Sequence, residues 1–277
     1  MNTKQIIVIV IVVALMGGLL ARPIKGLVDE DRGANESATS ESSSAFNLQS
    51  VSDITKQSIN ANLAGEITAL EEKLAETSGD EKLTLLGELA QKWDDVAKFA
   101  PQGFIYEEMA GISPKFEYWL KAGDAYRAAY TNLQDTTMSA ELNRLAIQSY
   151  EKATQLDENN LDAKTGLGAA MVTGTANPMA GIALLQEVVA KDPKNLQANK
   201  TLGLFSLQSR QFDKAIERFN TVVELNPDAE AYFYLATGYE NIGLKNEAIA
   251  AFQKSKELAS DPTLSQFIDR RVEELSK

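Results

Sequence analysis

The side chains of this chain that could do chemistry are its carboxylates, because the sequence contains neither His nor Cys. That composition excludes Ser-His-Asp and Cys-His nucleophilic sites, the HExxH metalloprotease helix, zinc sites built on His or Cys, and disulfides. Catalysis by Asp and Glu alone survives this filter, but those residues fall mostly on the expected exposed faces of helices. We therefore predict no enzyme, with no catalytic residue, no cofactor and no metal site.

The structural elements that must position these side chains are encoded by a sequence repeat. Self-similarity at about 33 to 34 residues is typical of stacked helical hairpins. Each hairpin has to bury its apolar face on a neighbour, so the product is a solenoid with a long concave surface, which suits the binding of other proteins. The pattern is Leu with a small residue, then Ala-Ile, then Phe, and it occurs twice at an offset of 33 residues: Leu202-Gly203, Ala215-Ile216 and Phe219, then Leu235-Ala236, Ala248-Ile249 and Phe252.

These residues resemble the tetratricopeptide repeat (TPR) family. Its pattern has an aromatic, Leu-Gly and a second aromatic in one helix, followed by Ala, an aromatic, a small residue and Pro in the next. The resemblance implies an all-α solenoid of about five repeats over residues 83–277, closed by a polar capping helix at 263–277. The copies cover residues 83–115, 119–153, 161–195, 196–228 and 229–261, of which 196–228 is the clearest and 83–115 the weakest.

The copy at 119–153 departs from the family pattern. Trp119, Gly123 and Tyr126 match the first helix, and Ala146 and Tyr150 match the second, but the two halves are 11 residues farther apart than the pattern allows. This spacing predicts a lengthened hairpin through residues 135–137.

In this family the first helix of each hairpin lines the concave surface, so the resemblance implies a partner-binding groove there. Val172, Gln197 and Glu230 map to outward-facing positions of these helices. The residues that we expect to contact a partner are Asp94, Glu117, Asp124, Arg127, Lys200, Leu204, Gln208, Phe233, Thr237 and Glu240.

The mapped surface is acidic in its first half and mixed in its second, where Leu204 and Phe233 are expected to be exposed. TPR receptors for the acidic tails of cytosolic chaperones place Lys and Asn where this chain has Gly87 and Gln91, so that role is not expected. We expect a basic or amphipathic helical segment of a protein partner. The alternative, that the acidic residues only keep an exposed groove soluble, stays open.

The charge of the chain limits its partners further. The net charge is −12, and residues 1–28 contribute +3, which leaves −15 on the rest. An acidic domain repels phosphates, so we expect no nucleic-acid binding. Anionic lipid headgroups are repelled as well, so any membrane attachment must come from the N-terminus.

Residues 1–28 predict an N-terminal transmembrane anchor. Residues 6–16 read IIVIVIVVALM, and a helix over residues 5–21 is about 26 Å long, enough for a thin span. A cleaved signal peptide is the alternative. A short N-terminal tail before the span and a large domain behind it favour a single pass through the inner (cytoplasmic) membrane, with the repeats in the periplasm.

Two segments connect this anchor to the repeats. Residues 29–50 are rich in Ser and acids and predict a flexible linker. Residues 51–82 predict an amphipathic helix that ends at 78–80. This helix either caps the first repeat or forms a short coiled coil that makes a homo-oligomer. Its apolar stripe is Ile59, Leu63, Ile67, Leu70 and Leu74.

We therefore expect a membrane-tethered scaffold or assembly factor that presents a TPR groove to protein partners. Residues 177–195, NPMAGIALLQEVVAKDPKN, resemble TPR subunits of bacterial cytochrome c maturation and nitrite reductase assembly. The layout of a short span before periplasmic repeats resembles chaperone-like TPR anchors of the protein-export machinery. A structural subunit built into a larger membrane complex is a further alternative.

Overall fold

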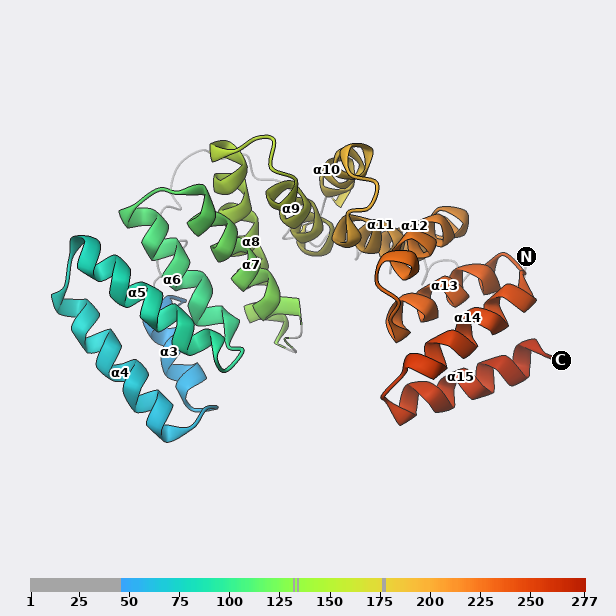
Figure 1. The fold of residues 1–277 in the computed structure, drawn as a ribbon, viewed down its shortest axis with the longest axis horizontal. Helices are drawn as coiled ribbons and strands as arrows, with labels where there is room; N and C mark the ends of the chain where they lie inside the picture. Colours follow the sequence, from blue (N-terminus) through green and yellow to red (C-terminus); the bar gives the residue numbers. More distant parts are fainter. Residues whose placement is uncertain (1–45, 132, 134, 176–177) are drawn as a thin grey trace, which may run out of the picture. The chain divides into compact units, whose positions relative to one another are not determined.

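The computed structural model describes residues 46–277, apart from residues 132, 134, 176 and 177. These residues form 13 helices and no strand, so the predicted all-α class is confirmed for them (Figure 1). The helices are α3 (Leu48–Lys56), α4 (Ala61–Glu76), α5 (Gly79–Asp94), α6 (Phe99–Ile112), α7 (Phe116–Thr131), α8 (Thr136–Leu156), α9 (Leu161–Gly174), α10 (Pro178–Lys191), α11 (Leu196–Gln208), α12 (Phe212–Leu225), α13 (Ala229–Asn241), α14 (Lys245–Leu258) and α15 (Pro262–Leu275).

The helices from α5 to α14 form five hairpins, as the sequence predicted. The pairs are α5–α6, α7–α8, α9–α10, α11–α12 and α13–α14, and each hairpin also packs on the next one along the chain. The first helices α7, α9, α11 and α13 contact one another in succession. This is the arrangement of a solenoid, in which one row of helices forms one face.

Asn and Asp residues set where most of the first helices begin. Asn160 accepts hydrogen bonds from the backbone N–H groups of Asp162 and Ala163 at the start of α9. Asn195 accepts a hydrogen bond from one backbone N–H group at the start of α11, and Asp228 accepts one at the start of α13. Such caps satisfy donors that have no partner inside the helix. Three of the five hairpins therefore carry their own start signal.

Aromatic rings packed against glycines hold neighbouring helices close together. A Cβ atom on Gly103 of α6 would lie 2.3 Å from the ring of Tyr126 on α7, and one on Gly203 of α11 would lie 2.8 Å from the ring of Phe219 on α12. Tyr126 and Phe219 are fully buried. Only glycine leaves room for these rings, which explains the small residue of the repeat pattern.

The N-terminal segment contains two helices where the sequence predicted one over residues 51–82. The chain breaks between α3 and α4, where the Ser58 hydroxyl donates to the Thr55 carbonyl and Asn60 caps α4 through the N–H of Asn62. Helix α3 also begins at Leu48, inside the predicted linker, because Asn47 and Ser50 form a capping box. Local capping by these polar residues separates α3 from α4, and the apolar stripe from Ile59 to Leu74 belongs to α4 and the residues just before it.

The apolar stripe of this segment packs within the chain. Ile67 and Leu74 of α4 are buried against Leu86, Leu89 and Trp93 of α5. Ile59, Leu63 and Leu70 pack against the same cluster. The stripe therefore covers the first hairpin, as the capping interpretation predicted.

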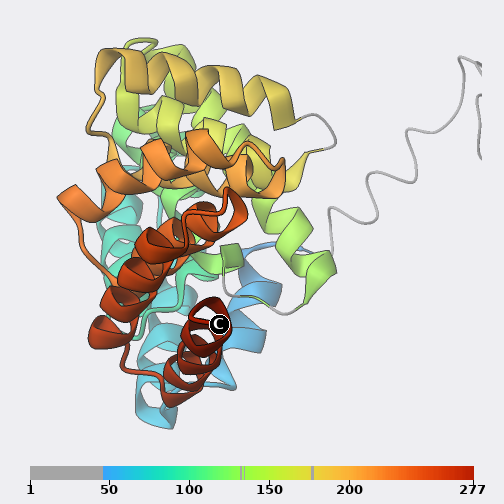
Figure 2. The same cartoon turned by 90° about the vertical axis from the view of Figure 1, so that its right-hand side faces the viewer.

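Helix α15 covers the other end of the repeats, beside α14 (Figures 1 and 2). Pro262 occupies the first turn, and Asp261 caps the helix through the N–H of Thr263. Ile268 is fully buried in the cluster formed by α12 to α15, while Arg270, Glu273 and Glu274 are exposed. This agrees with the predicted polar capping helix.

No helix in the described part of the chain is long and apolar enough to cross a membrane. The predicted anchor at residues 5–21 and residues 29–45 of the predicted linker lie outside the described residues.

Candidate functional site

A groove of about 1240 Å³ lies between the α7–α8 hairpin and helices α11 and α13, and the last turns of α9 also line it. We call it the α7–α13 groove. It carries three charged side chains, Arg127, Lys200 and Glu230, among many amides and hydroxyls. Its apolar lining includes Val172, Leu204 and Phe205. A lining of this kind suits an amphipathic ligand.

Helix α8 supplies one wall of the groove. It has 21 residues, where α10, α12 and α14 have 14 each. Asp135 caps it by accepting from the N–H groups of Thr137 and Met138. The lengthened hairpin predicted at 135–137 is therefore mainly a longer second helix, and its first turns place Thr136, Ser139 and Asn143 along the groove.

Tyr150 of α8 lies between two glycines and connects the core to the surface of α7. A Cβ on Gly166 of α9 would lie 2.3 Å from its ring, and one on Gly123 of α7 would lie 2.7 Å away. Its hydroxyl donates to Asp124 Oδ1 at 2.7 Å and accepts from Arg127 Nε at 3.1 Å. Burial raises the pKa of the Tyr150 phenol, so the hydroxyl keeps its proton and can donate.

The bonds to Tyr150 fix Arg127 at the edge of the groove. Arg127 Nη2 also lies 3.9 Å from Asp124 Oδ1. Burial raises the pKa of the Asp124 carboxyl, while the Tyr150 hydrogen bond and the Arg127 charge act in the opposite direction. The pair therefore presents a cation toward the groove, with its carboxylate held on the α7 surface.

A second ion pair joins two first helices across the groove. Lys200 Nζ of α11 lies 2.5 Å from Glu230 Oε2 of α13. Beside it, Gln197 Nε2 donates to Thr201 Oγ1 at 3.1 Å, and Gln208 is exposed. Leu204 is half-buried between these polar side chains. The groove thus offers an apolar strip with hydrogen-bonding groups on both sides.

Asn143 is a buried polar side chain in the α8 wall. Its Nδ2 donates to the Ala170 carbonyl at 3.1 Å and lies 3.4 Å from Thr173 Oγ1. A Cβ on Gly174 would lie 1.8 Å from Asn143 Oδ1, so the glycine at the end of α9 makes room for this amide. The side chain ties α8 to the end of α9 at the groove.

Four of the ten predicted groove residues line it: Arg127, Lys200, Leu204 and Gln208. Asp124 is bonded to Tyr150, and Asp94 Oδ1 accepts from Gln102 Nε2 at 3.2 Å. Glu117 is exposed at the start of α7. The Thr237 hydroxyl donates to the Phe233 carbonyl of its own helix. Val172, Gln197 and Glu230, which were mapped to the same surface, also line the groove.

Phe233 and Glu240 face α15 in place of an open surface. Phe233 packs against Phe252 and against Phe267 of α15, with ring centroids 5.6 Å and 5.8 Å apart. Glu240 forms a two-pronged ion pair with Arg271 of α15. The expected exposure of Phe233 did not allow for a capping helix that reaches over α13.

The sequence reasoning missed the contribution of α8. The mapping used only first helices, because those line the concave surface in an ideal repeat. The signals were the excess spacing before Ala146 and the polar Asn143 in a stripe that is otherwise apolar. Among the described residues, no group of three or more His, Cys, Asp or Glu side chains could hold a metal ion. The site can bind by hydrogen bonds, ion pairs and apolar contact.

Comparison with known proteins identifies the repeat. Models of the tetratricopeptide repeat match residues 177–237 and 229–262. Comparison with curated proteins gives no match.

Several solved structures are similar. MamA (41-end) from Desulfovibrio magneticus RS-1 is 23% identical over 66% of this chain and 97% of that one, with a TM-score of 0.51. Another MamA structure is 27% identical over 65% and 92%, with a TM-score of 0.49. YrrB, a TPR protein with an unusual peptide-binding site, is 19% identical over 73% and 98%, with a TM-score of 0.48. Residues 177–262 therefore carry tetratricopeptide repeats, within a row of helical hairpins that runs from α5 to α14.

Proposed function

We propose that this protein is a scaffold that binds a segment of a partner protein in the α7–α13 groove. The observation that carries the proposal is the groove itself, which is large and lined by both apolar and hydrogen-bonding side chains. An amphipathic segment fits it best. Its apolar side would contact Leu204 and Phe205, and its polar side would meet Gln197 and Gln208.

Basic residues at the end of that segment would be attracted by acidic side chains outside the groove. The exposed carboxylates Asp94 and Glu117 lie on α5 and at the start of α7, outside the groove lining. Within the groove the charges are mixed, because Lys200 is paired with Glu230. Apolar and hydrogen-bond contacts would therefore supply most of the affinity, and the acidic side chains would steer a basic segment toward it.

We further propose that the scaffold is held on a membrane by residues 5–21, on the extracytoplasmic side. The support is the apolar run at 6–16, together with the short N-terminal tail before it and the large domain that follows it. Of the pathways considered above, assembly of cytochrome c or nitrite reductase rests on the resemblance of residues 177–195. Removing residues 1–28 should release the protein from membrane pellets, and protease added outside spheroplasts should cleave the anchored repeats.

The groove is tested by purifying the full-length protein in mild detergent and quantifying co-eluting proteins by mass spectrometry. Leu204→Gln changes the apolar strip, and Leu196→Gln on the same helix is the matched control, because Leu196 is 38% exposed and does not line the groove. We expect one dominant partner that is lost with Leu204→Gln and kept with Leu196→Gln. Equal retention by both variants, at unchanged melting temperature, would exclude the groove as the contact.

A further inference from the structure

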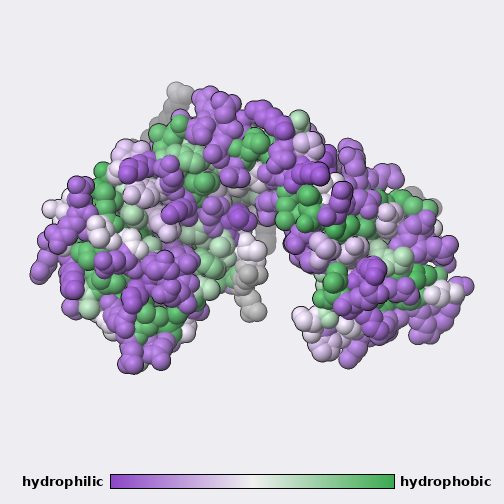
Figure 3. All heavy atoms as spheres, viewed as in Figure 1, coloured by the Kyte–Doolittle hydropathy of each residue, from purple (hydrophilic) through white to green (hydrophobic). Residues whose placement is uncertain are grey.

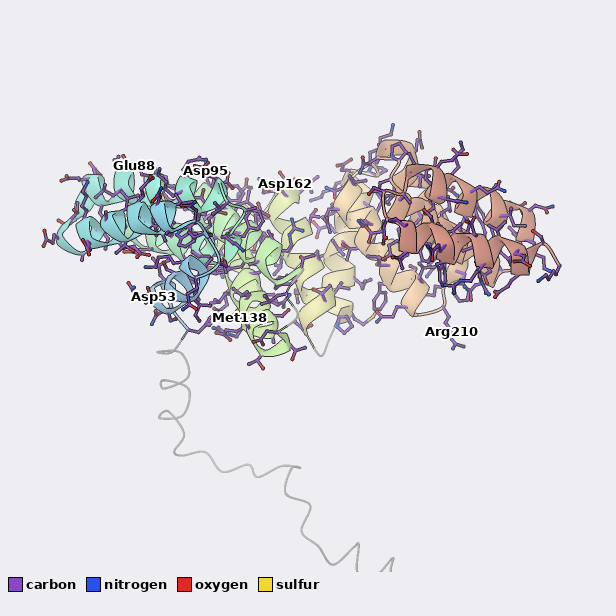
Figure 4. All side chains as sticks on the ribbon, turned by 90° about the horizontal axis from the view of Figure 1, so that it is seen from below. Asp53, Glu88, Asp95, Met138, Asp162 and Arg210 are labelled. Carbon is purple, nitrogen blue, oxygen red and sulfur yellow. The ribbon has the colours of Figure 1, made fainter. Side chains whose placement is uncertain are left out.

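A second pocket, of about 390 Å³, lies beside helix α3. We call it the α3 pocket. It is enclosed by α3, the start of α6, the end of α7 and the start of α8, and its lining includes Ile54, Lys98, Leu133, Met138 and Leu142. Figure 4 shows Met138 of α8 beside α3. Leu133 also lines the α7–α13 groove.

Helix α3 is fastened on two sides, so the pocket has a defined wall. Its Ser52 hydroxyl donates to Glu71 Oε1 of α4 at 2.5 Å, and Lys56 Nζ lies 2.7 Å from Glu71 Oε2. On the other side, Phe46 packs edge-on against Phe104 of α6, with ring centroids 5.6 Å apart. The pocket is therefore built by folding, although an ideal hairpin array has no equivalent of α3.

The lining of the α3 pocket is mostly apolar and includes one cationic side chain. Its polar lining consists of Thr55, Ser58 and Lys98. The two hydroxyls already donate to the carbonyls of Val51 and Thr55, at 2.6 Å and 2.8 Å. No carboxylate belongs to the described lining, and the Lys98 ammonium forms no ion pair with any described residue. An anion is therefore the charge complement of this site.

The mouth of the pocket is apolar as well. Ile54 is 57% exposed and Leu133 is 37% exposed. On the face of the molecule that Figure 3 shows, apolar and polar side chains are interspersed. The size and lining are those of small-molecule pockets. A peptide backbone would bring C=O groups, for which the two bonded hydroxyls have no donor left, and burying a C=O group unpaired costs free energy. A hydrocarbon chain contains no polar groups that need a partner.

We propose that the α3 pocket binds the hydrocarbon chain of an anionic amphiphile of the fatty-acid class, with its acidic headgroup at Lys98. Two sources share this chemistry, a free fatty acid and an acidic membrane lipid. In both cases the chain would lie against Ile54 and Met138, and the headgroup would stay at the mouth. This site is separate from the proposed function, because the α7–α13 groove lacks Ile54, Lys98 and Met138.

The test uses the full-length protein in nanodiscs of phosphatidylcholine and dodecanoate that carries a photoreactive diazirine. Mass spectrometry of the digested protein locates the adducts. We expect saturable labelling on peptides that contain Ile54 and Met138, competed by unlabelled dodecanoate but not by dodecyltrimethylammonium, which has the same chain and the opposite charge. Labelling that is spread over many peptides, or that never saturates, would overturn the proposal.

Two pairs of variants separate the headgroup from the chain. Lys98→Glu should reduce labelling about tenfold, because an attraction becomes a repulsion. Lys152→Glu, at an exposed position farther along α8, should leave it unchanged. Ile54→Gln should weaken labelling several-fold, while Leu258→Gln, at a site 48% exposed, should not. An unaltered signal with Lys98→Glu or with Ile54→Gln would exclude this site.

The source of the amphiphile is read from competition in the same nanodiscs. Displacement of the probe by phosphatidic acid added to the bilayer identifies a membrane lipid as the ligand. Displacement by dodecanoate alone identifies a free fatty acid. Failure of both to compete would overturn the proposal.

Discussion

Arg210 has a backbone conformation that suits glycine. It lies between α11 and α12 with φ +59°, and Gly243 takes the corresponding position between α13 and α14 with φ +79°. The left-handed region costs a residue with a Cβ roughly 1–2 kcal/mol. The Arg210 side chain is exposed and points away from the ribbon (Figure 4), so replacing it removes no ion pair with a described residue.

Arg210→Gly should therefore raise the free energy of unfolding by about 0.5–1 kcal/mol, since glycine's greater freedom in the unfolded chain offsets part of the gain. Urea unfolding followed by circular dichroism measures the change. Gly243→Ala is the matched control and should destabilise by a similar amount, because a Cβ there meets no atom within 4 Å and only the conformation is strained. A loss of stability in Arg210→Gly would contradict the argument.

Asp124 makes the stability of the protein depend on pH. Burial raises the pKa of its carboxyl, and the Asp162 charge on α9 adds to the rise. The folded protein therefore holds this proton at a pH where the unfolded chain has lost it. The stabilisation is fully present at low pH and is lost as the pH rises through the folded pKa.

Relative to Asp124→Asn, the wild-type protein should lose stability between about pH 3 and pH 6. The amide oxygen of this variant can still accept a hydrogen bond from the Tyr150 hydroxyl, so that bond is kept. About half of the side chain is exposed, which limits the difference to about 1 kcal/mol. Thermal melts across this pH range measure the difference in stability. Glu151→Gln, at an exposed site on α8, is the control for removing a carboxylate elsewhere on the surface. A difference that grows in the other direction would contradict the assigned cause.

At the scale of elements, the sequence predicted the hairpins well because most of them repeat the same local signals. Leu-Gly or Leu-Ala, then Ala, then an aromatic locate the two helices, and Asn or Asp marks the next start. The pattern gives no information where the chain departs from the repeat. The prediction therefore missed the break before Asn60. It also assigned the additional residues before Ala146 to a connection, whereas they belong to helix α8.

The same limit applies to the candidate groove. Lys200, Leu204 and Gln208 were found because they stand at regular positions of α11. The α8 wall and the cover that α15 places over Phe233 depend on tertiary packing of irregular elements. Side-chain exposure on a first helix can be read from spacing only where its neighbours are regular repeats.

Docking of α15 on α13 should depend on Arg271. Arg271 bonds Glu240, whose side chain is 16% exposed, whereas Arg270 forms no ion pair with a described residue. Charged hydrogen bonds contribute about 1.5–3 kcal/mol. We expect Arg271→Ala to lower the free energy of unfolding by about 1–2 kcal/mol and Arg270→Ala to change it by less than about 0.5 kcal/mol.

A double-mutant cycle with Glu240→Gln separates the bond to Glu240 from the other contacts that Arg271→Ala removes, such as the ion pair with Glu274 on the same helix. If the ion pair is responsible, the two substitutions should be strongly non-additive in urea unfolding. Additive effects would mean that α15 is held by its apolar contacts, chiefly Ile268.

At the scale of the whole molecule, the described repeats have no single core. Buried side chains form four separate clusters: one over α4 to α6, one over α7 to α9, one over α10 and α11, and one over α12 to α15. In such an array stability is a sum of units and nearest-neighbour interfaces. A groove that spans several clusters can therefore change width without global unfolding.

This organisation predicts that damage stays local. Phe252 of α14 is buried in the C-terminal cluster and Trp93 of α5 in the N-terminal one. Either residue changed to Ala should cost about 3 kcal/mol or more within its own cluster. Hydrogen exchange followed by mass spectrometry should then show that Phe252→Ala loses protection over α12 to α15 and keeps it over α4 to α6. Trp93→Ala should give the reverse. Uniform loss of protection in both variants would show instead that the repeats unfold as one unit, and the groove would then be as rigid as the whole array.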